Sequence, residues 1–424
     1  MKRILLSGLL TLLAGMATAQ TTLDLDVELR NNNSQKVTGH PVSVILSKSF
    51  STHSALVTDN GREIPCQLDD FDGDGIFDEL FFLADIESKK TKAFKVQLFA
   101  EGKPRDYSPQ VYVEMMLTNK SIKESNKQNL YISQLTVDRD VNPYNMLHHH
   151  GAAFENDMVA YRIYFDHRQT VDIYGKYKRG LELRQTQFYP DDAQKAAGFG
   201  DDVLWVGSTL GLGTLRGWDG SKPTMISNVE HRSQRILARG PLRTIVEVTD
   251  LQWLQDSSTD LPVNMTTRYT LYAGRRDCQV DVTFNRNVSS LRFATGIINV
   301  KNSVEYSDNH GLRGCWGTDW PVSEKDSVGH KRETVGLGIC LPEANIERQL
   351  PADKDNYAFV VKIPRPFLTY FITFGSDNES FGYHSSKEWF AYLDSWKKTL
   401  ELKKAVTQFV KMRSGDVKMI PTKK

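Results

Sequence analysis

The sequence predicts a mainly β protein, an antiparallel β-supersandwich closed by a C-terminal helix. Most of the chain consists of short segments in which apolar and polar residues alternate, or in which β-branched and aromatic residues follow one another. Turn-forming sequences recur between these segments, and helical periodicity is nearly confined to one stretch near the C-terminus. Roughly twenty strands exceed one small sandwich, so we expect two long sheets with a concave face open to a polymer.

The first twenty residues, MKRILLSGLLTLLAGMATAQ, have the pattern of a secretory signal peptide. Two basic residues precede a short apolar run, and Ala17-Thr18-Ala19 forms a small-residue cleavage site. The apolar run is too short to span a membrane. We therefore expect a signal peptide at residues 1–19 and a periplasmic or secreted mature chain with no membrane span.

Predicted strands follow one another along the mature chain, the clearest being HPVSVILS, KAFKVQLFA, QVYVEMML, NMTTRYTLYAG and CQVDVTFN. Between them the polar segment 119–140 marks the most plausible seam. It separates an N-terminal β region, residues 20–118, from a main β-sandwich with the C-terminal helix, residues 119–424. One continuous domain over residues 20–424 is the alternative.

Two segments have helical character. In residues 385–414, apolar side chains recur at steps of three and four, and Ser385 or Ser386 is placed to cap the helix. The segment PDDAQKAAG predicts a second, short helix with Pro190 at its start.

Charge and cysteine content exclude several classes of protein. The formal net charge is +1, which argues against electrostatic binding of nucleic acid. The four cysteines are far apart without a C-x-x-C spacing, which excludes a zinc finger or a redox motif; they are Cys66, Cys278, Cys315 and Cys340. An exported protein permits a disulfide, but small buried apolar side chains are the favoured interpretation.

An acidic segment, DDFDGDGIFDELFF, has the beginning of a calcium-loop spacing. Asp70, Asp72, Asp74 and Asp78 stand at relative positions 1, 3, 5 and 9, with a glycine at position 6. The pattern fails at position 12, which is Phe81 where an EF-hand has glutamate. We interpret the segment as a hairpin tip that holds a structural calcium; an acidic turn without an ion is the alternative.

The segment NMLHHHGAAFEN contains three successive histidines, His148, His149 and His150. In an extended chain His148 and His150 share one face and His149 points to the other. A zinc site of His148, His150 and one distant histidine is the weaker alternative, because adjacent histidines on a strand diverge. A surface loop without function is a further alternative.

Residues suited to proton transfer and anion binding accompany the triplet. The candidates for catalysis are imidazoles and phenols, which act as general bases and acids: His148, His149, His150, Tyr161, Tyr174 and His231. The candidates for substrate binding include arginines, which hold carboxylates, and tryptophans, which stack on sugar rings: Arg162, Arg216, Trp218, Arg232, His310 and Trp316.

This combination suits an anionic oligosaccharide or polysaccharide, most simply one containing uronic acid. Neutralising the carboxylate makes the C5 hydrogen easier to remove, and a second group protonates the oxygen leaving from C4. The reaction is β-elimination, giving a 4,5-unsaturated uronate without a cofactor, as a lyase or a dehydratase. The alternatives are a non-catalytic glycan-binding protein, a mutarotase- or epimerase-like enzyme, and a glycoside hydrolase that pairs Glu155 with Asp201 or Asp202.

Four longer segments resemble the domain-of-unknown-function family 4861: IPCQLDDFDGDGIFDELFFLADI, YNMLHHHGAAFENDMVAYRIYFDHRQTVDIYGK, GFGDDVLWVGSTLGLGTLRGWDG and RYTLYAGRRDCQVDV. The resemblance runs from about residue 23 to the C-terminus. It implies an exported protein of a Bacteroidetes polysaccharide-utilisation system with a galactose-mutarotase-like supersandwich. A relative in ulvan degradation implies an oligosaccharide dehydratase acting on a terminal uronic acid. The site residues above follow from side-chain chemistry and not from this resemblance.

Overall fold

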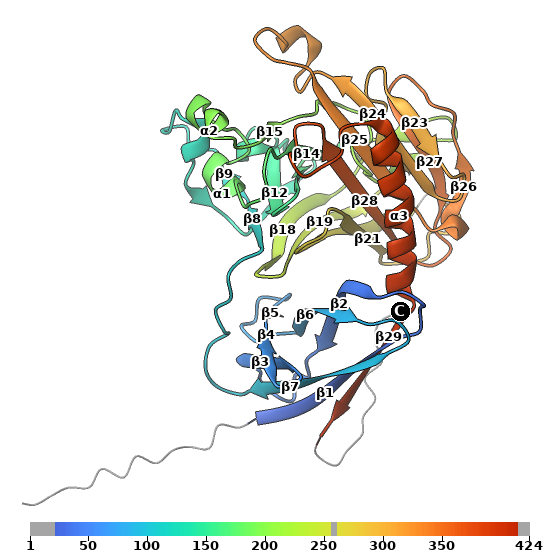
Figure 1. Cartoon of the computed structure of the whole chain (residues 1–424). Helices are drawn as coiled ribbons and strands as arrows, with labels where there is room; N and C mark the ends of the chain where they lie inside the picture. The colour runs from blue at the N-terminus through green and yellow to red at the C-terminus, as the bar shows by residue number, and fades with distance from the viewer. Residues whose placement is uncertain (1–21, 256–260, 414–424) are drawn as a thin grey trace, which may run out of the picture.

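The computed structural model describes residues 22–255 and 261–413. The predicted signal peptide lies outside these residues. The chain forms a smaller β unit, drawn at the bottom of Figure 1, and a larger one above it. Within the described ranges, no helix combines the length and the apolar character that crossing a membrane requires.

The smaller unit is a β-sandwich of two antiparallel sheets. A five-stranded sheet has the order β29-β1-β7-β3-β4 and faces a three-stranded sheet of order β2-β6-β5. Alternating residues such as Val27, Phe82 and Phe94 fill the space between the sheets, as expected for strands with one buried face. The strands are β1 (Thr22–Asn31), β2 (Val37–Ile45), β3 (Ser54–Asp59), β4 (Arg62–Ile64), β5 (Cys66–Asp69), β6 (Glu79–Ile86), β7 (Thr91–Phe99) and β29 (Val406–Met412).

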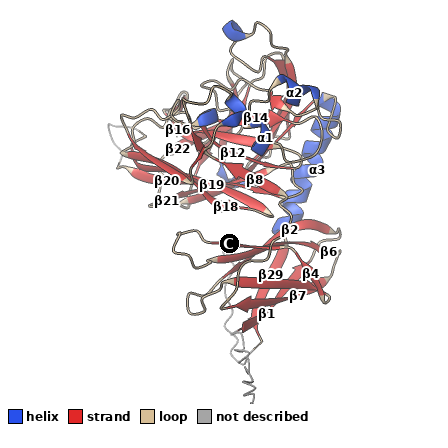
Figure 2. Cartoon of the chain, turned by 90° about the vertical axis from the view of Figure 1, so that its left-hand side faces the viewer, coloured by secondary structure: helices blue, strands red, loops and turns tan. Residues whose placement is uncertain are grey.

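The larger unit is built on a nine-stranded antiparallel sheet, whose strands β18 to β21 are labelled in Figure 2. Its order is β11-β18-β19-β20-β21-β28-β25-β24-β23. The strands are β11 (Gln134–Asp138), β18 (His231–Arg239), β19 (Arg243–Trp253), β20 (Val263–Tyr272), β21 (Cys278–Phe284), β23 (Val304–Ser307), β24 (Leu312–Asp319), β25 (Glu333–Cys340) and β28 (Phe367–Ser376).

Two five-stranded sheets form the opposite layer of the larger unit. Their orders are β15-β14-β13-β12-β8 and β17-β16-β22-β27-β26, and one apolar core joins both to the nine-stranded sheet. The strands are β8 (Val111–Glu114), β12 (Gly151–Asn156), β13 (Ala160–Tyr164), β14 (Val171–Gly175), β15 (Asp201–Asp202), β16 (Arg216–Trp218), β17 (Pro223–Thr224), β22 (Arg292–Ile298), β26 (Ile346–Gln349) and β27 (Asn356–Lys362). The predicted mainly β, antiparallel class is confirmed.

Short elements complete the fold. A small ladder pairs β9 (Met116–Leu117) with β10 (Leu130–Tyr131). The short helices are α1 (Leu183–Thr186), α2 (Asp192–Ala196), η1 (Ser125–Lys127), η2 (His148–His150), η3 (Glu324–Asp326) and η4 (Glu343–Asn345). Helix α2 begins at Asp192 behind an Asp191 capping box, so Pro190 precedes the cap and does not start the helix as predicted.

The long helix α3 (Ser386–Lys404) packs on the outer face of the nine-stranded sheet. Ser385 caps it, as predicted, and accepts a hydrogen bond from the backbone N–H of Glu388. Its apolar stripe includes Trp389 and Leu393, which lie over glycines of β24 and β25. A Cβ at Gly314 would come within 2.2 Å of Leu393, so the close approach requires glycine.

The predicted helix extends too far at its C-terminal end. Helix α3 ends at Lys404, and residues 406–412 form β29, which pairs with β1 of the smaller unit. The segment VTQFVKM is rich in β-branched residues, and the edge of β1 offers backbone partners that a continued helix would leave unpaired.

The division between the two units also differs from the predicted seam. Strand β8 already pairs with β12 of the larger unit. The chain therefore passes from the smaller to the larger unit between the end of β7 and residue 111. The C-terminal strand β29 returns to the smaller unit. All four cysteines are buried and free, which confirms their interpretation as small buried side chains.

Candidate functional site

The outer face of the sheet β15-β14-β13-β12-β8 carries an unusual density of polar side chains. On β13, Tyr161 and Ile163 enter the apolar core, so Arg162 points to the opposite face, where the hydroxyl of Tyr164 contacts it. The neighbouring strands add more groups to this outer face, which the η2 and α1 segments cover: Tyr112, Glu114, Glu155, Asp172, Tyr174 and Asp202. We call this set the outer-face cluster.

The histidine triplet forms a 3-10 turn, not the extended segment that was expected. His149 and His150 have φ angles of 41° and 67°, in the left-handed region that non-glycine residues rarely adopt. A hydrogen bond of 2.8 Å from the backbone N–H of Phe165 to the carbonyl oxygen of His150 stabilises the turn. As a result His149 lies against Glu114 on the outer face, and its ring lies 4.8 Å from that of His148.

Backbone carbonyls fix the tautomers of two of the histidines. Nε2 of His148 lies 3.1 Å from the carbonyl oxygen of Gln187, and Nδ1 of His150 lies 2.9 Å from that of Tyr144. A carbonyl only accepts, so these nitrogens carry the protons in the neutral rings. Nδ1 of His148 and Nε2 of His150 therefore hold the free lone pairs.

Burial keeps both rings uncharged at neutral pH. It lowers the pKa of His148 to about 3 and the pKa of His150 to about 4. His150 also stacks on the ring of Tyr144, with centroids 3.7 Å apart, and meets Tyr164 edge-on at 5.9 Å. His150 is the half-buried member of the triplet, whereas His148 and His149 are buried.

Arg162 is the centre of the cluster, and its charge is already matched. Its guanidinium donates to Asp172 Oδ2 at 2.6 Å and to Asp202 Oδ2 at 2.7 Å. It also donates to the hydroxyl of Tyr189 at 2.9 Å and lies 4.1 Å from the ring centroid of Phe188. Burial raises the pKa of Asp202 well above its ordinary value. The predicted role of Arg162 as the carboxylate-holding group does not fit a guanidinium saturated in this way.

Two residues that the sequence did not select lie at the half-exposed edge of the cluster. Arg168 donates from Nε and Nη2 to Oδ2 of Asp166 and lies over the rings of Tyr144 and Tyr164, at 4.5 and 5.2 Å. Tyr189 accepts the hydrogen bond from Arg162, so its own proton stays available to an acceptor. Its ring lies 5.6 Å from that of His148. No sequence signal marked Tyr189.

Below the triplet, Glu114 is a buried acid. Burial raises its pKa to about 8, so it is largely protonated at neutral pH. It accepts a hydrogen bond from Tyr112 at 2.8 Å, and Oε1 lies 3.3 Å from Nε2 of His149. These contacts support the turn from beneath and leave His149 out of reach of solvent.

Two of the predicted catalytic tyrosines have structural partners. Tyr161 faces the core, and its hydroxyl donates to the carbonyl of Arg276 at 2.8 Å. Tyr174 shares the outer face but lies under α1, where its hydroxyl donates to Glu182 at 3.1 Å. Strand alternation separates Tyr161 from the triplet, and the α1 segment covers Tyr174.

The other predicted site residues lie elsewhere. Arg216 is buried and donates to the carbonyls of Arg168, Ser208 and Thr209. Arg232 is held by Asp250 at 2.8 Å. The remaining four have local partners away from the cluster: Trp218 packs on Ala294 and Val360, His231 pairs with Asp138, His310 pairs with Glu343, and Trp316 lies near Trp389. Period-two alternation indicates which residues share a strand face, but not which faces meet in space.

The acidic segment is a β-hairpin tip between β5 and β6, as predicted. Carboxylate oxygens of Asp70, Asp72 and Asp78 lie within 4.8 Å of one another, so three of the four predicted ligands fit a hard cation. Asp74 instead accepts from the backbone N–H of Ile76 and lies 3.6 Å from Lys48. Within residues 22–255 and 261–413, no group of three metal-ligating side chains includes the histidine triplet.

The buried neutral histidines predict acid sensitivity. Between the pKa of the unfolded ring, about 6.5, and the folded value of about 4, His150 binds more protons in the unfolded state. Its contribution therefore makes the free energy of unfolding fall as the pH drops through this window. Differential scanning calorimetry across pH 4 to 6.5 should show a smaller decline of the melting temperature in His150→Asn than in wild type. An unchanged decline, matching that of the exposed-site control His310→Asn, would contradict this.

Comparisons with known proteins give a family and two distant structural likenesses. A family model described as "Domain of unknown function (DUF4861)" matches residues 29–406. No curated protein matches the chain. An alpha-mannosidase from Enterococcus faecalis V583 is 11% identical with a TM-score of 0.43, covering 93% of this chain and 47% of its own. A glycosyl hydrolase family 38 protein from Enterococcus faecalis is 10% identical with a TM-score of 0.44, covering 92% and 48%. The chain thus spans about half the length of these proteins.

Proposed function

Because the chain belongs to the DUF4861 family, a domain family of unknown function, we propose from its own chemistry that it performs β-elimination on uronic-acid-containing oligosaccharides. One observation carries the proposal. A proton-accepting nitrogen, Nε2 of His150, and a proton-donating hydroxyl, that of Tyr189, belong to one cluster around Arg162 and Tyr164. Elimination requires a base and an acid of this kind.

Arg168 supplies the positive charge for the substrate carboxylate. It shares the Tyr144 and Tyr164 rings with His150, and its side chain is partly exposed. Its Nε and Nη2 atoms bond Asp166, and we propose Nη1 as the donor to an incoming carboxylate. A guanidinium beside the carboxylate stabilises the negative charge that develops when the neighbouring carbon loses its hydrogen.

The proposed elimination needs one proton acceptor and one proton donor. Nε2 of His150 takes the C5 hydrogen as a proton, and the C5–H electron pair forms the C4=C5 double bond. The C4–O bond breaks, and the Tyr189 hydroxyl gives its proton to the departing oxygen. A free hydroxyl at C4 leaves as water, which makes the enzyme a dehydratase, whereas a glycosidic oxygen leaves as a shorter saccharide, which makes it a lyase.

Trp205 is the best candidate to stack on a sugar ring. It follows Asp202 by three residues and is 44% exposed, unlike the buried Trp218 that the sequence suggested. An exposed indole offers a flat apolar face to the C–H side of a pyranose. Export to the periplasm or the medium remains part of the proposal and rests on residues 1–19.

The contacts of Glu155 disfavour hydrolysis as the alternative. Its carboxylate is fully buried and accepts from Lys176 and from the backbone N–H groups of Glu182 and Leu183. A hydrolytic carboxylate pair needs two groups that reach the substrate. A non-catalytic glycan-binding role remains the competing proposal, and it requires neither His150 nor Tyr189.

The experiment is an ultraviolet assay with saturated uronate-terminated oligosaccharides. We expect absorbance of a 4,5-unsaturated uronate to rise with wild-type protein, and mass spectrometry to report either loss of one water or a shortened chain. New reducing ends without unsaturation would indicate a hydrolase. No change with folded protein, for glucuronate-, iduronate- and galacturonate-terminated substrates, would contradict catalysis.

We also propose that the hairpin tip holds a structural calcium through Asp70, Asp72 and Asp78. Calcium at about one hundred times its dissociation constant should stabilise the protein by about 2.7 kcal/mol. The expected result is a higher melting temperature in calcium than in chelator, lost in Asp70→Asn and retained in the surface control Asp157→Asn. Identical melting temperatures of wild type in calcium and in chelator would contradict this site.

A further inference from the structure

A cavity of about 980 Å³ lies between the two units of the molecule. Its walls are β2, the hairpin tip and β29 of the smaller unit, and the outer face of the nine-stranded sheet. The outer-face cluster around Arg162 belongs to the opposite layer, and the main apolar core separates the two. The cavity is therefore distinct from the site proposed for catalysis, and its volume falls within the usual range for ligand sites.

The floor of the cavity is a polar ladder across five adjacent strands. Five residues stand directly opposite one another in the register, namely Arg235, Glu247, Arg268, Asp281 and Thr369. Four of them line the cavity, and Glu247 is buried between the two arginines. Glu247 accepts from Arg235 at 2.7 Å and from Arg268 at 2.6 Å, and Asp281 accepts from Thr369 at 2.5 Å. The row alternates donors and acceptors at the spacing of neighbouring strands, about 4.8 Å.

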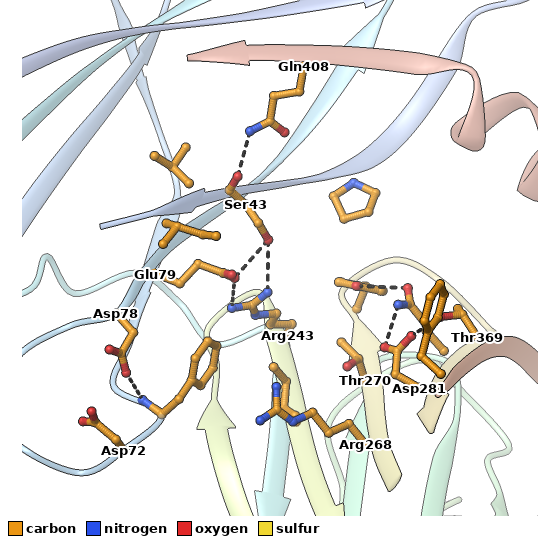
Figure 3. Close-up of a pocket in the computed structure, with 18 of the residues that line it drawn as sticks. Ser43, Asp72, Asp78, Glu79, Arg243, Arg268, Thr270, Asp281, Thr369 and Gln408 are labelled. Atoms are coloured by element: carbon orange, nitrogen blue, oxygen red, sulfur yellow. Dashed lines mark hydrogen bonds and ion pairs between the residues drawn. The ribbon is translucent and has the colours of Figure 1, made fainter. Parts of the chain in front are cut away.

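The facing wall repeats this mixture of donors and acceptors, as Figure 3 shows. Ser43 donates to Glu79 at 2.9 Å, and Arg243, which comes from β19 on the other side of the cavity, donates to Glu79 at 2.5 Å. Nε2 of Gln408 donates a hydrogen bond of 2.7 Å to the backbone carbonyl oxygen of Ser43. The ring of Phe71 lies 5.8 Å from the Arg243 guanidinium and 5.9 Å from that of Arg268, which adds an apolar surface among polar groups.

The charges of the lining residues balance, and this selects the chemical class of ligand. Four cations line the cavity, Lys48, Arg235, Arg243 and Arg268, and four carboxylates, Asp72, Asp78, Glu79 and Asp281. Without calcium at the hairpin tip, a polyanion finds no excess of positive charge among these side chains. A ligand with many hydroxyls can donate to the carboxylates and accept from the guanidiniums at the same time.

Arg268 can donate hydrogen bonds to such a ligand from its two terminal guanidinium nitrogens. Among residues 22–255 and 261–413, it hydrogen-bonds only through Nε, and its side chain is 42% exposed. We propose that this cavity binds a neutral, hydroxyl-rich oligosaccharide, at a site apart from the catalytic face. The proposal is independent of the elimination chemistry, because it uses none of the same residues.

Isothermal titration calorimetry with cellohexaose, xylohexaose and mannohexaose tests the proposal on the whole protein. We expect at least one of these neutral probes to bind, and Arg268→Gln to weaken that binding by about tenfold or more. The control Arg292→Gln changes a similarly exposed, ion-paired arginine on β22 and should bind as wild type. His150→Asn should also bind as wild type, which separates this site from the catalytic one.

Three results would overturn the proposal. They are absence of heat with all three neutral probes, equal binding by Arg268→Gln and wild type, and tighter binding of hexagalacturonate than of every neutral hexaose. Asp281→Asn provides a second variant on the same ladder, and it should weaken the binding together with Arg268→Gln. Circular dichroism of each variant establishes that a loss of binding is not a loss of fold.

Discussion

Replacing His150 with asparagine is expected to lower kcat/KM for elimination by about 10²- to 10⁴-fold, the usual contribution of a general base. The substitution removes Nε2, the accepting nitrogen that the hydrogen bond to Tyr144 O leaves unprotonated. Asparagine tolerates the left-handed backbone conformation of position 150, so the turn should persist. Initial rates of ultraviolet absorbance with a uronate-terminated oligosaccharide measure the change.

Two further variants make this result specific. Tyr189→Phe should lower kcat, because it removes the proton donor and keeps the ring beside Arg162. His310→Asn changes an exposed histidine paired with Glu343 and should leave the rate unchanged. A His150→Asn protein that is folded and retains wild-type kcat/KM would remove His150 from the mechanism.

Replacing Arg162 with methionine should lower the free energy of unfolding by about 3 to 5 kcal/mol, as expected when one partner of a buried ion pair is removed. The Arg162 side chain is 4% exposed and that of Asp172 is fully buried, so the substitution leaves an unpaired carboxylate beneath the histidine turn. Asp202 loses the same partner. Urea denaturation followed by circular dichroism measures the loss.

A surface pair provides the matched control for this prediction. Arg292 and Glu347 form an ion pair with both side chains more than one third exposed, so Arg292→Met should cost less than about 1 kcal/mol. In the double variant Arg162→Met with Asp172→Asn, part of the lost stability should return. If Arg162→Met lowers the free energy of unfolding no more than Arg292→Met does, water reaches the carboxylates of Asp172 and Asp202 and the prediction is wrong.

The strands were predictable because their pattern is local. In β7, the apolar residues Phe94, Val96 and Leu98 alternate with polar ones, and these three side chains are the buried ones of the strand. The start of α3 was equally local, since Ser385 precedes its apolar stripe. The end of α3 depends on β1, which lies nearly four hundred residues away in the chain and offers its edge to residues 406–412.

The candidate site was only partly predictable for the same reason. The triplet and Arg162 were identified from residue type, and they lie together. The tautomers of His148 and His150 depend on carbonyls of residues 187 and 144, and the 3-10 turn depends on positive φ angles that histidine rarely adopts. No pattern within the α1 segment indicated that Tyr189 reaches Arg162.

Proton NMR of the sugar ring follows the hydrogen that His150 is proposed to remove. With wild-type protein and a uronate-terminated oligosaccharide, the C5 hydrogen signal should disappear while a vinylic C4 hydrogen signal appears at the same rate. With His150→Asn, both changes should slow together. A C5 hydrogen that persists in the presence of folded wild-type protein, whether the oligosaccharide is shortened or unchanged, would contradict elimination at this site.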